Sequence, residues 1–360
     1  MSCNDEQVVA HNMTKIFLLI FLVLLYCTSH VVGAKDDLYV NITILESATA
    51  QGAVCLDGSP PAYHLHRGHG TGLGSWIIYL DGGGWCDSIT ACLNRSTTNL
   101  GSTKHMGKEG FFDGILHNTS IRNPEFHNWN RVRIKYCDGS SFTGDVEQVD
   151  PENKLYFRGA RIFKAIMEDL WSKGLESAEN AILSGISAGG LATILNCDKF
   201  KCLLPENARV GCVADAGFFI YGRTIDDTSY IQEMYHKIVN LHMKNILVPP
   251  HVDPQHVWED CLNNTKTCTS SQHIAIQAFG VEFLKTFEGL PPCFTRGYFL
   301  TSCYSHGGIL APPYWFSSTS PRLLNKTIGE TVADWYFERT RFQCIDPYPC
   351  VKVCKDLNNH

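Results

Sequence analysis

The sequence lacks any long run of charges of one sign, and it has no dense cluster of lysine and arginine. Its formal net charge is −6 over 360 residues, so nothing in it matches the charge pattern of a nucleic-acid-binding protein, and no nucleic-acid partner is expected. Internal repeats and low-complexity linkers are also absent from the sequence. Because 44% of the residues are apolar, the chain has enough hydrophobic side chains for a core, which excludes intrinsic disorder.

The apolar run near the N-terminus, residues 16–27, is short for a transmembrane helix, which needs about twenty apolar residues. Lys15 precedes this run and the small residues Val32-Gly33-Ala34 follow it, an order typical of a secretory signal peptide cleaved after Ala34. We therefore predict a signal peptide at residues 1–34, a single domain at residues 35–360, and no stable membrane partner. The leading residues 1–14 are long for a signal and include two acidic side chains, which leaves a membrane anchor as the alternative.

The sequence has no C-x-x-C pair, which disfavours a zinc site, and no metal is expected. Its sixteen cysteines become fourteen once Cys3 and Cys27 leave with the signal. An even number of cysteines in an oxidising compartment predicts disulfides, although their pairing stays open. Cys344, Cys350 and Cys354 are expected to staple the C-terminal tail.

Glycosylation acceptors of the N-x-S/T type occur in the mature region and agree with secretion when they are combined with the signal. They are Asn41, Asn94, Asn118, Asn263 and Asn325. The sequence thus predicts a secreted, extracellular glycoprotein rich in disulfides.

Alternating and short apolar segments predict a series of strands, at residues 39–45, 62–66, 76–80, 132–136, 181–183, 210–214 and 298–301. Amphipathic or helix-forming segments are found at residues 159–173, directly after Ser187, and at residues 327–337. Strands that alternate with helices indicate an α/β fold in which a mainly parallel sheet is covered by helices on both faces.

Ser187 stands in the pentapeptide Gly185-Ile186-Ser187-Ala188-Gly189, between a predicted strand and a predicted helix. Such a sharp turn lifts a serine hydroxyl off the edge of a sheet and places it beside the free N–H groups of a helix N-terminus. A serine in this position suits nucleophilic attack on an acyl carbon. A plain strand–helix turn explains the same residues when they are taken alone.

A nucleophilic serine needs a base, and His306 follows a late predicted strand and precedes two glycines. The order serine, acid, histidine is that of α/β-hydrolases. The backbone N–H groups of Ala188 and of Gly84 or Trp85 are candidate donors to the oxyanion that forms during acyl transfer. A surface histidine and a tight glycine turn are the structural alternatives. In a parallel sheet the carboxyl ends of the strands share one edge, where all of these residues are expected.

Two further polar clusters have less specific interpretations. A loop with Asp138, Ser140, Ser141, Thr143 and Asp145 is predicted to line the substrate groove, and a turn held by side-chain hydrogen bonds explains it nearly as well. A second cluster contains three histidines and is expected to be solvated loop rather than a metal site. Its members are His64, His66 and His69.

Several motifs together resemble the plant pectin acetylesterase family, which is related to the animal carboxylesterase Notum. The matching segments are L-D-G-G-G-W-C at 80–86, Y-C-D-G-S-S-F-T-G-D at 136–145, G-I-S-A-G-G-L-A at 185–192, D-A-G-F-F at 215–219, S-C-Y-S-H at 302–306 and N-K-T-I-G-E-T-V-A-D-W-Y-F at 325–337. The resemblance extends over nearly all of the mature chain.

The resemblance implies an α/β-hydrolase fold and a cell-wall esterase that removes acetyl groups from pectin, the homogalacturonan of the wall, without a cofactor. It implies that Ser187 is the nucleophile and His306 the base, with Gly84, Trp85 and Ala188 as oxyanion donors. Acetylated pectin is then the expected partner. Cleavage of longer acyl esters, as in the animal relative, is the alternative within the same enzyme class.

One departure from the family lies before Lys244. In the family, a strand that ends in a motif like N-A-A-Y-D-S-W-Q precedes this region, and its Asp is the triad acid. Here residues 234–242 lead almost directly into Lys244, so the strand, the acid and a cysteine-bearing loop are expected to be missing. Asp215 follows a strand, but its family equivalent is not the triad acid, and no acid is assigned.

Losing the triad aspartate costs roughly 10⁴ in kcat, because the imidazole loses its orientation and tautomer. The alternative function is therefore a catalytically silent family member that only binds wall polysaccharide.

Overall fold

The computed structural model describes residues 37–219, 230–242, 269–270, 280–281, 283–287, 295–301, 303 and 305–346. The chain divides into two compact units, Met1–Asp37 and Leu38–His360, and all elements below belong to the second unit. The predicted signal peptide lies outside the described residues and stays a prediction. No helix in the described part of the chain has the length and apolar character needed to cross a membrane.

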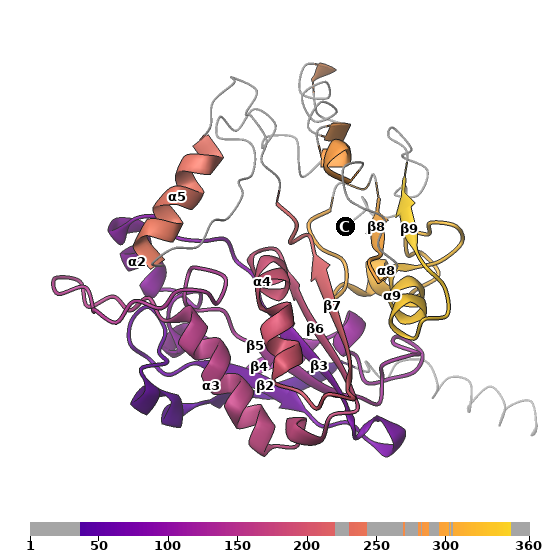
Figure 1. Cartoon of the computed structure of the whole chain (residues 1–360), viewed down its shortest axis with the longest axis horizontal. Coiled ribbons are helices and arrows are strands. Elements are labelled where there is room, and N and C mark those ends of the chain that lie inside the picture. Colours follow the sequence, from indigo (N-terminus) through magenta and orange to yellow (C-terminus); the bar gives the residue numbers. More distant parts are fainter. Residues whose placement is uncertain are drawn as a thin grey trace, which may run out of the picture. The chain divides into compact units, whose positions relative to one another are not determined.

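A seven-stranded sheet forms the centre of the unit, with the strand order β4-β1-β2-β5-β3-β6-β7 (Figure 1). The strands are β1 (Leu38–Ile44), β2 (Ala62–His66), β3 (Ser75–Leu80), β4 (Glu109–Phe112), β5 (Asn130–Ile134), β6 (Asn180–Ile186) and β7 (Arg209–Asp215). All six residues of β3 are buried, as expected for a central strand with both faces covered.

The predicted α/β-hydrolase-like fold is confirmed, but the sheet is mixed where a mainly parallel one was expected. The strands β5, β3, β6 and β7 pair in parallel, whereas β4, β1, β2 and β5 pair antiparallel. Segment patterns identify strands without fixing their direction. The connection from β1 to β2 contains only a short 3-10 helix and lacks the long helical crossover that parallel neighbours require, so these two strands pair antiparallel.

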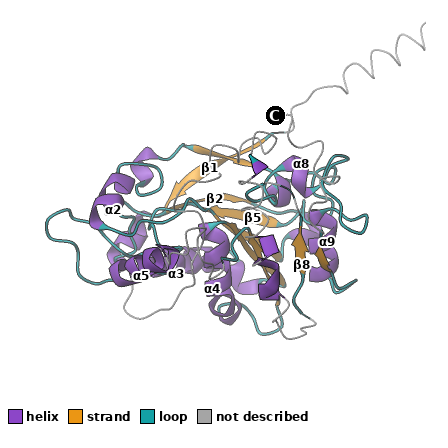
Figure 2. Ribbon diagram, turned by 90° about the horizontal axis from the view of Figure 1, so that it is seen from above, coloured by secondary structure: helices purple, strands orange, loops and turns teal. Residues whose placement is uncertain are grey.

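Helices cover both faces of the sheet, as the sequence predicts. Alternate residues of β3 face opposite layers: Trp76, Ile78 and Leu80 pack with α3 (Gly159–Ser172) and α4 (Ala188–Cys202). Ile77 and Tyr79 pack on the other face with α8 (Pro312–Trp315) and α9 (Ile328–Tyr336). Figure 2 shows α3 and α4 on one side of the strands and α8 and α9 toward the other.

Two further helices among the described residues are α2 (Ile89–Ser96), which Ser88 caps by accepting from Ala91 N, and α5 (Tyr230–His242). The helix α9 begins with a capping box, in which Thr327 and Glu330 satisfy each other's backbone N–H groups. The amphipathic pattern of α3 predicts that Ile162, Phe163, Ile166, Met167, Leu170 and Trp171 share its inner face. All of them are buried except Trp171, which is 39% exposed.

The late strand predicted at residues 298–301 exists as β8 (Tyr298–Leu300), but it pairs in parallel with β9 (Gln343–Ile345) rather than with the central sheet. Within the described residues the central sheet ends at β7. Whether a late strand is missing from the sheet stays a prediction.

Three disulfides join described residues: Cys55–Cys137, Cys86–Cys92 and Cys197–Cys212. The predicted role of Cys344 in stapling the tail is wrong, because Cys344 on β9 is a free thiol, as is the exposed Cys202. An even number of cysteines allows every cysteine to form a disulfide. It does not show which cysteines lie close enough to pair. Cys350 and Cys354 lie outside the described residues.

We predict that the double substitution of Cys197 and Cys212 by alanine lowers the free energy of unfolding by about 3 kcal/mol, the value expected for a closed loop of this length. The disulfide closes 15 residues between α4 and β7. Urea unfolding measures the change. Cys202→Ala, which removes an exposed free thiol, is the control and should unfold like the wild type; equal stability of all three proteins would contradict the prediction.

Candidate active site

Ser187 lies at the turn between β6 and α4 with a backbone conformation that is rare for a residue with a side chain. Its φ is 56° and its ψ is −122°. Strain of this kind costs about 1–3 kcal/mol and persists only where the surroundings enforce it. Here Ser187 N donates to Asp215 O at 2.9 Å, and Ser187 O accepts from Leu191 N at 2.9 Å. The predicted sharp strand–turn–helix is therefore present, and Ser187 is half-buried.

The glycine-rich segment after β3 packs directly against this turn. A methyl group on Gly82 would lie 2.3 Å from Ile186 O and 3.1 Å from Ser187 Cβ, so only glycine permits this approach. Gly84 has a φ of 63°, which favours glycine as well. Within the described part of the chain, the N–H groups of Gly84, Trp85 and Ala188 donate to no hydrogen bond.

Both ends of this segment are fixed. At its start, Asp81 pairs with Arg133 (Nε–Oδ1 2.7 Å) and with Lys135, both next to or on β5. Burial works to raise the pKa of Asp81, but the two cations hold it below its ordinary value, so the carboxylate stays charged. At the other end, the Cys86–Cys92 disulfide joins the segment to α2. These attachments position the glycines between them.

His306 lies in an exposed loop that docks on the same edge of the sheet. The docking is made by Asp215, at the end of β7: its Oδ2 accepts from Gly308 N at 2.7 Å and from Ile309 N at 3.0 Å. A methyl group on Gly307 would lie 2.1 Å from Ile186 Cδ1, so the loop also touches the residue before Ser187. The structure thus brings the neighbours of Ser187 and His306 into contact.

Asp215 is the acidic side chain that binds the loop carrying His306. Burial raises the pKa of Asp215, and the two N–H bonds and His306 act in the opposite direction. Among the residues that the structure describes, His306 makes no hydrogen bond to a carboxylate or to Ser187. The sequence identifies Asp215 only as a residue that follows a strand. Its contacts to Gly308 and Ile309 show that it binds the loop that carries His306.

The predicted groove at residues 138–145 is wrong for its central members. Asp138, Ser140 and Ser141 are each exposed by 1% or less. Asp138 Oδ2 accepts from Ser140 Oγ at 2.7 Å and from Phe142 N at 3.0 Å, which makes the segment a buried turn. Side-chain hydrogen bonds of this kind satisfy the polar groups within the turn. Polar residues in this segment therefore do not indicate an exposed surface.

The prediction that the three histidines lie in a solvated loop is wrong for His64 and His66. His64 and His66 lie on β2, and His64 is 2% exposed with its Nδ1 2.8 Å from Val40 O. His66 Nδ1 accepts from Arg131 at 2.8 Å. These contacts give the two rings structural roles.

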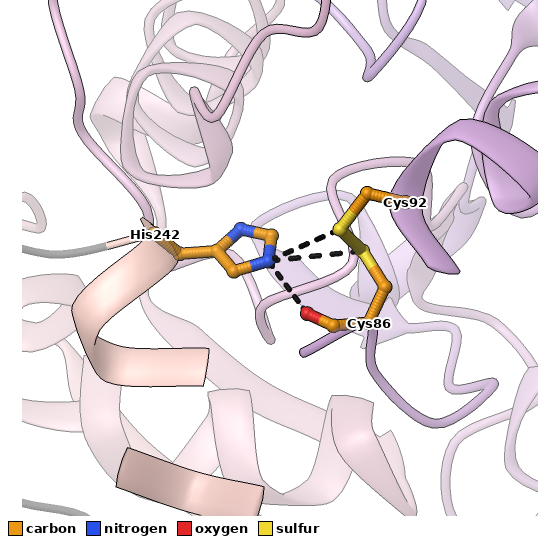
Figure 3. Close-up of side chains that lie close together, drawn as sticks. All are labelled: Cys86, Cys92 and His242. Carbon is orange, nitrogen blue, oxygen red and sulfur yellow. Dashed lines mark hydrogen bonds between the residues drawn. A yellow bond between two sulfur atoms is a disulfide. The ribbon is translucent and has the colours of Figure 1, made fainter. Parts of the chain in front are cut away.

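Within the described residues, one group has the composition of a metal site: Cys86, Cys92 and His242 (Figure 3). The figure shows that the two sulfur atoms are joined in a disulfide, which removes the thiolates that a metal would need. His242 Nε2 lies 2.8 Å from Cys86 O, 3.7 Å from Cys86 Sγ and 3.6 Å from Cys92 Sγ. The histidine therefore packs on the disulfide and hydrogen-bonds to its backbone.

The comparison with known proteins begins with the pectinacetylesterase family model, which matches residues 33–249 and 240–355. Pectin acetylesterase 11 and pectin acetylesterase 7 of Arabidopsis thaliana are each 42% identical to the chain, over 91% and 89% of its length and 93% of theirs. The chain belongs to the pectinacetylesterase family. It is thus a member of a family of carboxylic ester hydrolases.

A solved structure supports the fold of this family member independently. The Wnt deacylase Notum from Drosophila superimposes with a TM-score of 0.71 over 88% of this chain and 99% of the other, at 20% sequence identity. At this identity the likeness shows the fold alone.

The family model matches the chain in two ranges that overlap at residues 240–249. The alignment with pectin acetylesterase 11 runs over 374 positions, more than the 360 residues of this chain, so that relative has residues without a counterpart here. The overlap lies close to Lys244, before which a strand and an acid are predicted to be missing; that absence stays a prediction.

His242 generates a prediction about acid stability. Burial lowers the pKa of His242 to about 4 from an ordinary value of 6.5, against the raising effect of its bond to Cys86. A pKa that is lower in the folded state means that the stabilisation is complete above pH 6.5 and is lost as the pH falls through about 4. We expect the free energy of unfolding to fall more steeply over this window in the wild type than in His242→Gln.

Urea unfolding at a series of pH values measures this difference. His64 and His66, whose pKa values burial also lowers, are present in both proteins and cancel in the comparison. Parallel stability curves for the two proteins would contradict the assignment to His242.

Proposed function

We propose that this protein is a secreted serine esterase that removes acetyl groups from cell-wall pectin. The observation that carries the proposal is the strained turn at Ser187, which packs against Gly82 of the segment that carries Gly84 and Trp85. The N–H groups of Gly84, Trp85 and Ala188 have no partner among the described residues. Family membership supports the substrate class, because the relatives that cover most of the chain are named pectin acetylesterases. The disulfides support an oxidising, extracellular location.

In the proposed reaction the Ser187 hydroxyl attacks the acetyl carbon of the ester, and His306 takes its proton. The negative oxygen of the tetrahedral intermediate accepts hydrogen bonds from the free N–H groups of Gly84, Trp85 and Ala188. Collapse breaks the bond to the sugar oxygen, which leaves with the proton from His306. A water molecule then gives its proton to His306 and attacks the acetyl-serine, which releases acetate and restores the serine. No cofactor or metal takes part in this scheme.

The scheme assigns to Asp215 the task of the absent triad acid. Its carboxylate fixes the loop that carries His306, and its negative charge favours the imidazolium that forms in each step. The charged or titratable groups that face it are His306 and, from β3, the hydroxyl of Tyr79, which stays protonated because burial raises its pKa.

A second candidate function rests on the absence of a hydrogen bond from His306 to any carboxylate among the described residues. It is a catalytically silent protein that keeps the fold and binds wall polysaccharide. A fluorophosphonate probe separates the two candidates, because it labels a serine only when that serine is activated.

We predict that Ser187→Ala abolishes acetate release from acetylated pectin, because the acyl-enzyme can no longer form. Released acetate is measured enzymatically. The control is Ser47→Ala, which changes an exposed serine far along the chain from the turn and should keep full activity. Equal release by the wild type and Ser187→Ala would refute the proposed nucleophile. A wild type that neither releases acetate nor reacts with the fluorophosphonate supports the silent alternative.

We predict that Asp215→Asn lowers kcat about 10- to 100-fold, less than the roughly 10⁴ known for a fully hydrogen-bonded triad acid. The asparagine oxygen still accepts from Gly308 and Ile309, so the loop stays in place while the charge is lost.

Asp215→Ala, which removes the acceptor as well as the charge, is expected to lose more activity than Asp215→Asn. An Asp215→Asn enzyme with the wild-type kcat would show that Asp215 only holds the loop.

A further inference from the structure

The N–H groups proposed to bind the oxyanion belong to a glycine segment that has no regular secondary structure to orient it. We infer that Arg95 and Tyr136 are positioning residues that fix the two peptide planes carrying the N–H groups of Gly84 and Trp85. This inference rests on the proposed function, and it adds two residues to which neither the sequence motifs nor the relatives assign a role.

The first peptide plane joins Gly83 to Gly84. Its oxygen, Gly83 O, accepts from Arg95 Nη1 at 2.8 Å. Because a peptide bond is planar and trans, the C=O of one residue and the N–H of the next point in opposite directions. Holding Gly83 O on the side of α2 therefore turns the N–H of Gly84 away from α2.

The second peptide plane joins Gly84 to Trp85 and is held in the same way. Its oxygen, Gly84 O, accepts from the hydroxyl of Tyr136 at 2.8 Å. The N–H of Trp85 then points away from the buried side of the segment, where Tyr136 lies with 1% of its surface exposed. Both N–H groups lack a partner among the described residues, as donors reserved for a ligand should.

Such control matters because the glycines permit other orientations. Gly83 has a φ of 140° and Gly84 a φ of 63°, both in the region where glycine meets little steric resistance. A peptide that flips exchanges the positions of its N–H and its C=O, and a carbonyl oxygen beside an oxyanion repels it. The two side-chain donors oppose that flip on successive peptides.

The two donors are themselves held in place. Arg95 Nε donates to Leu100 O at 3.0 Å, and its guanidinium lies over the Tyr136 ring, 5.0 Å from the centroid. The Tyr136 hydroxyl accepts from Ser141 N at 3.0 Å, and Ser141 Oγ accepts from the indole of Trp85 at 2.7 Å. Burial raises the pKa of Tyr136, and Asp138 raises it further, so the hydroxyl keeps the proton that it donates to Gly84 O.

This network gives the buried turn at residues 138–144 a function. The turn places Ser141 between Tyr136 and Trp85, so that one serine accepts from the indole and donates its backbone N–H to the phenol. The segment thus acts on the candidate site from behind the glycines, without lining a groove.

The test is Tyr136→Phe, which removes one oxygen atom and leaves the ring for Arg95 to cover. Because an oxyanion contact forms only in the transition state, kcat should fall about 10- to 100-fold while KM changes by less than about threefold. The matched control is Tyr63→Phe: Tyr63 is fully buried too, but its hydroxyl donates to Asp169 and not to the glycine segment. It should lose stability without losing kcat.

Arg95→Met repeats the test on the first peptide, since methionine keeps an apolar stem and lacks the donor. We expect a similar fall in kcat at little change in KM, and Arg95→Lys, which retains one donor, should recover part of it. Thermal midpoints identify any variant that is merely unfolded.

The outcomes separate this inference from the proposed function. Activity that survives Ser187→Ala, or a wild type that neither hydrolyses acetyl esters nor reacts with a fluorophosphonate, contradicts the proposed function and the inference with it. If Ser187 is required but Tyr136→Phe keeps the same kcat as Tyr63→Phe, the proposed function stands and the positioning role is overturned.

Discussion

The register of three parallel strands is the constraint on which the candidate site depends. Leu80 of β3 pairs with Gly185 of β6, and Ile186 of β6 pairs with Asp215 of β7. The strands therefore end at nearly the same level, and the chain leaves each of them at one edge of the sheet. The same pairing allows Asp215 O to accept from Ser187 N, which helps to hold the serine in its strained conformation.

Around that edge, side chains act mainly by binding backbone groups. Asp215 accepts from the N–H groups after His306, while Arg95 and Tyr136 donate to the carbonyl oxygens before Gly84 and Trp85. Stabilisation of a developing charge works best when the donors need no reorganisation at the moment of reaction. Irregular loops supply such donors only if something rigid holds them, and here the rigid parts are β5, β7 and α2.

The sequence predicts the parts of this arrangement that have a local pattern. The turn at Ser187 follows from an apolar segment, small residues and a helix-forming run, and the strands β2 and β3 follow from their alternating or continuous apolar residues. The strand β4 escaped prediction because E-G-F-F is short and contains a glycine and a charge. The pairing of β8 with β9 escaped prediction because an apolar segment indicates a strand without naming its neighbour.

Long-range contacts explain the other differences. A side chain that binds a backbone oxygen in a distant loop needs no particular spacing in the sequence, so nothing marked Arg95. Asp138 and Ser140 have the composition of a surface loop, and only the hydrogen bonds between them show that the loop is buried. Residues whose role depends on a partner far along the chain therefore require the fold.

The gap that the sequence predicts near residue 244 bears on the energetics as well as on the list of catalytic groups. β7 is the last strand of the central sheet among the described residues, and Ala214 and His306 are exposed beside its end. His306 is exposed to water, whose dielectric constant is high, so the charge of Asp215 polarises this imidazole less than it would a buried one. Serine esterases without a working triad keep about 10³- to 10⁴-fold catalysis over water from their oxyanion donors and binding. In this chain the proposed reaction therefore depends more on Gly84, Trp85 and Ala188, and on the side chains that hold them, than it does in an enzyme with an intact triad.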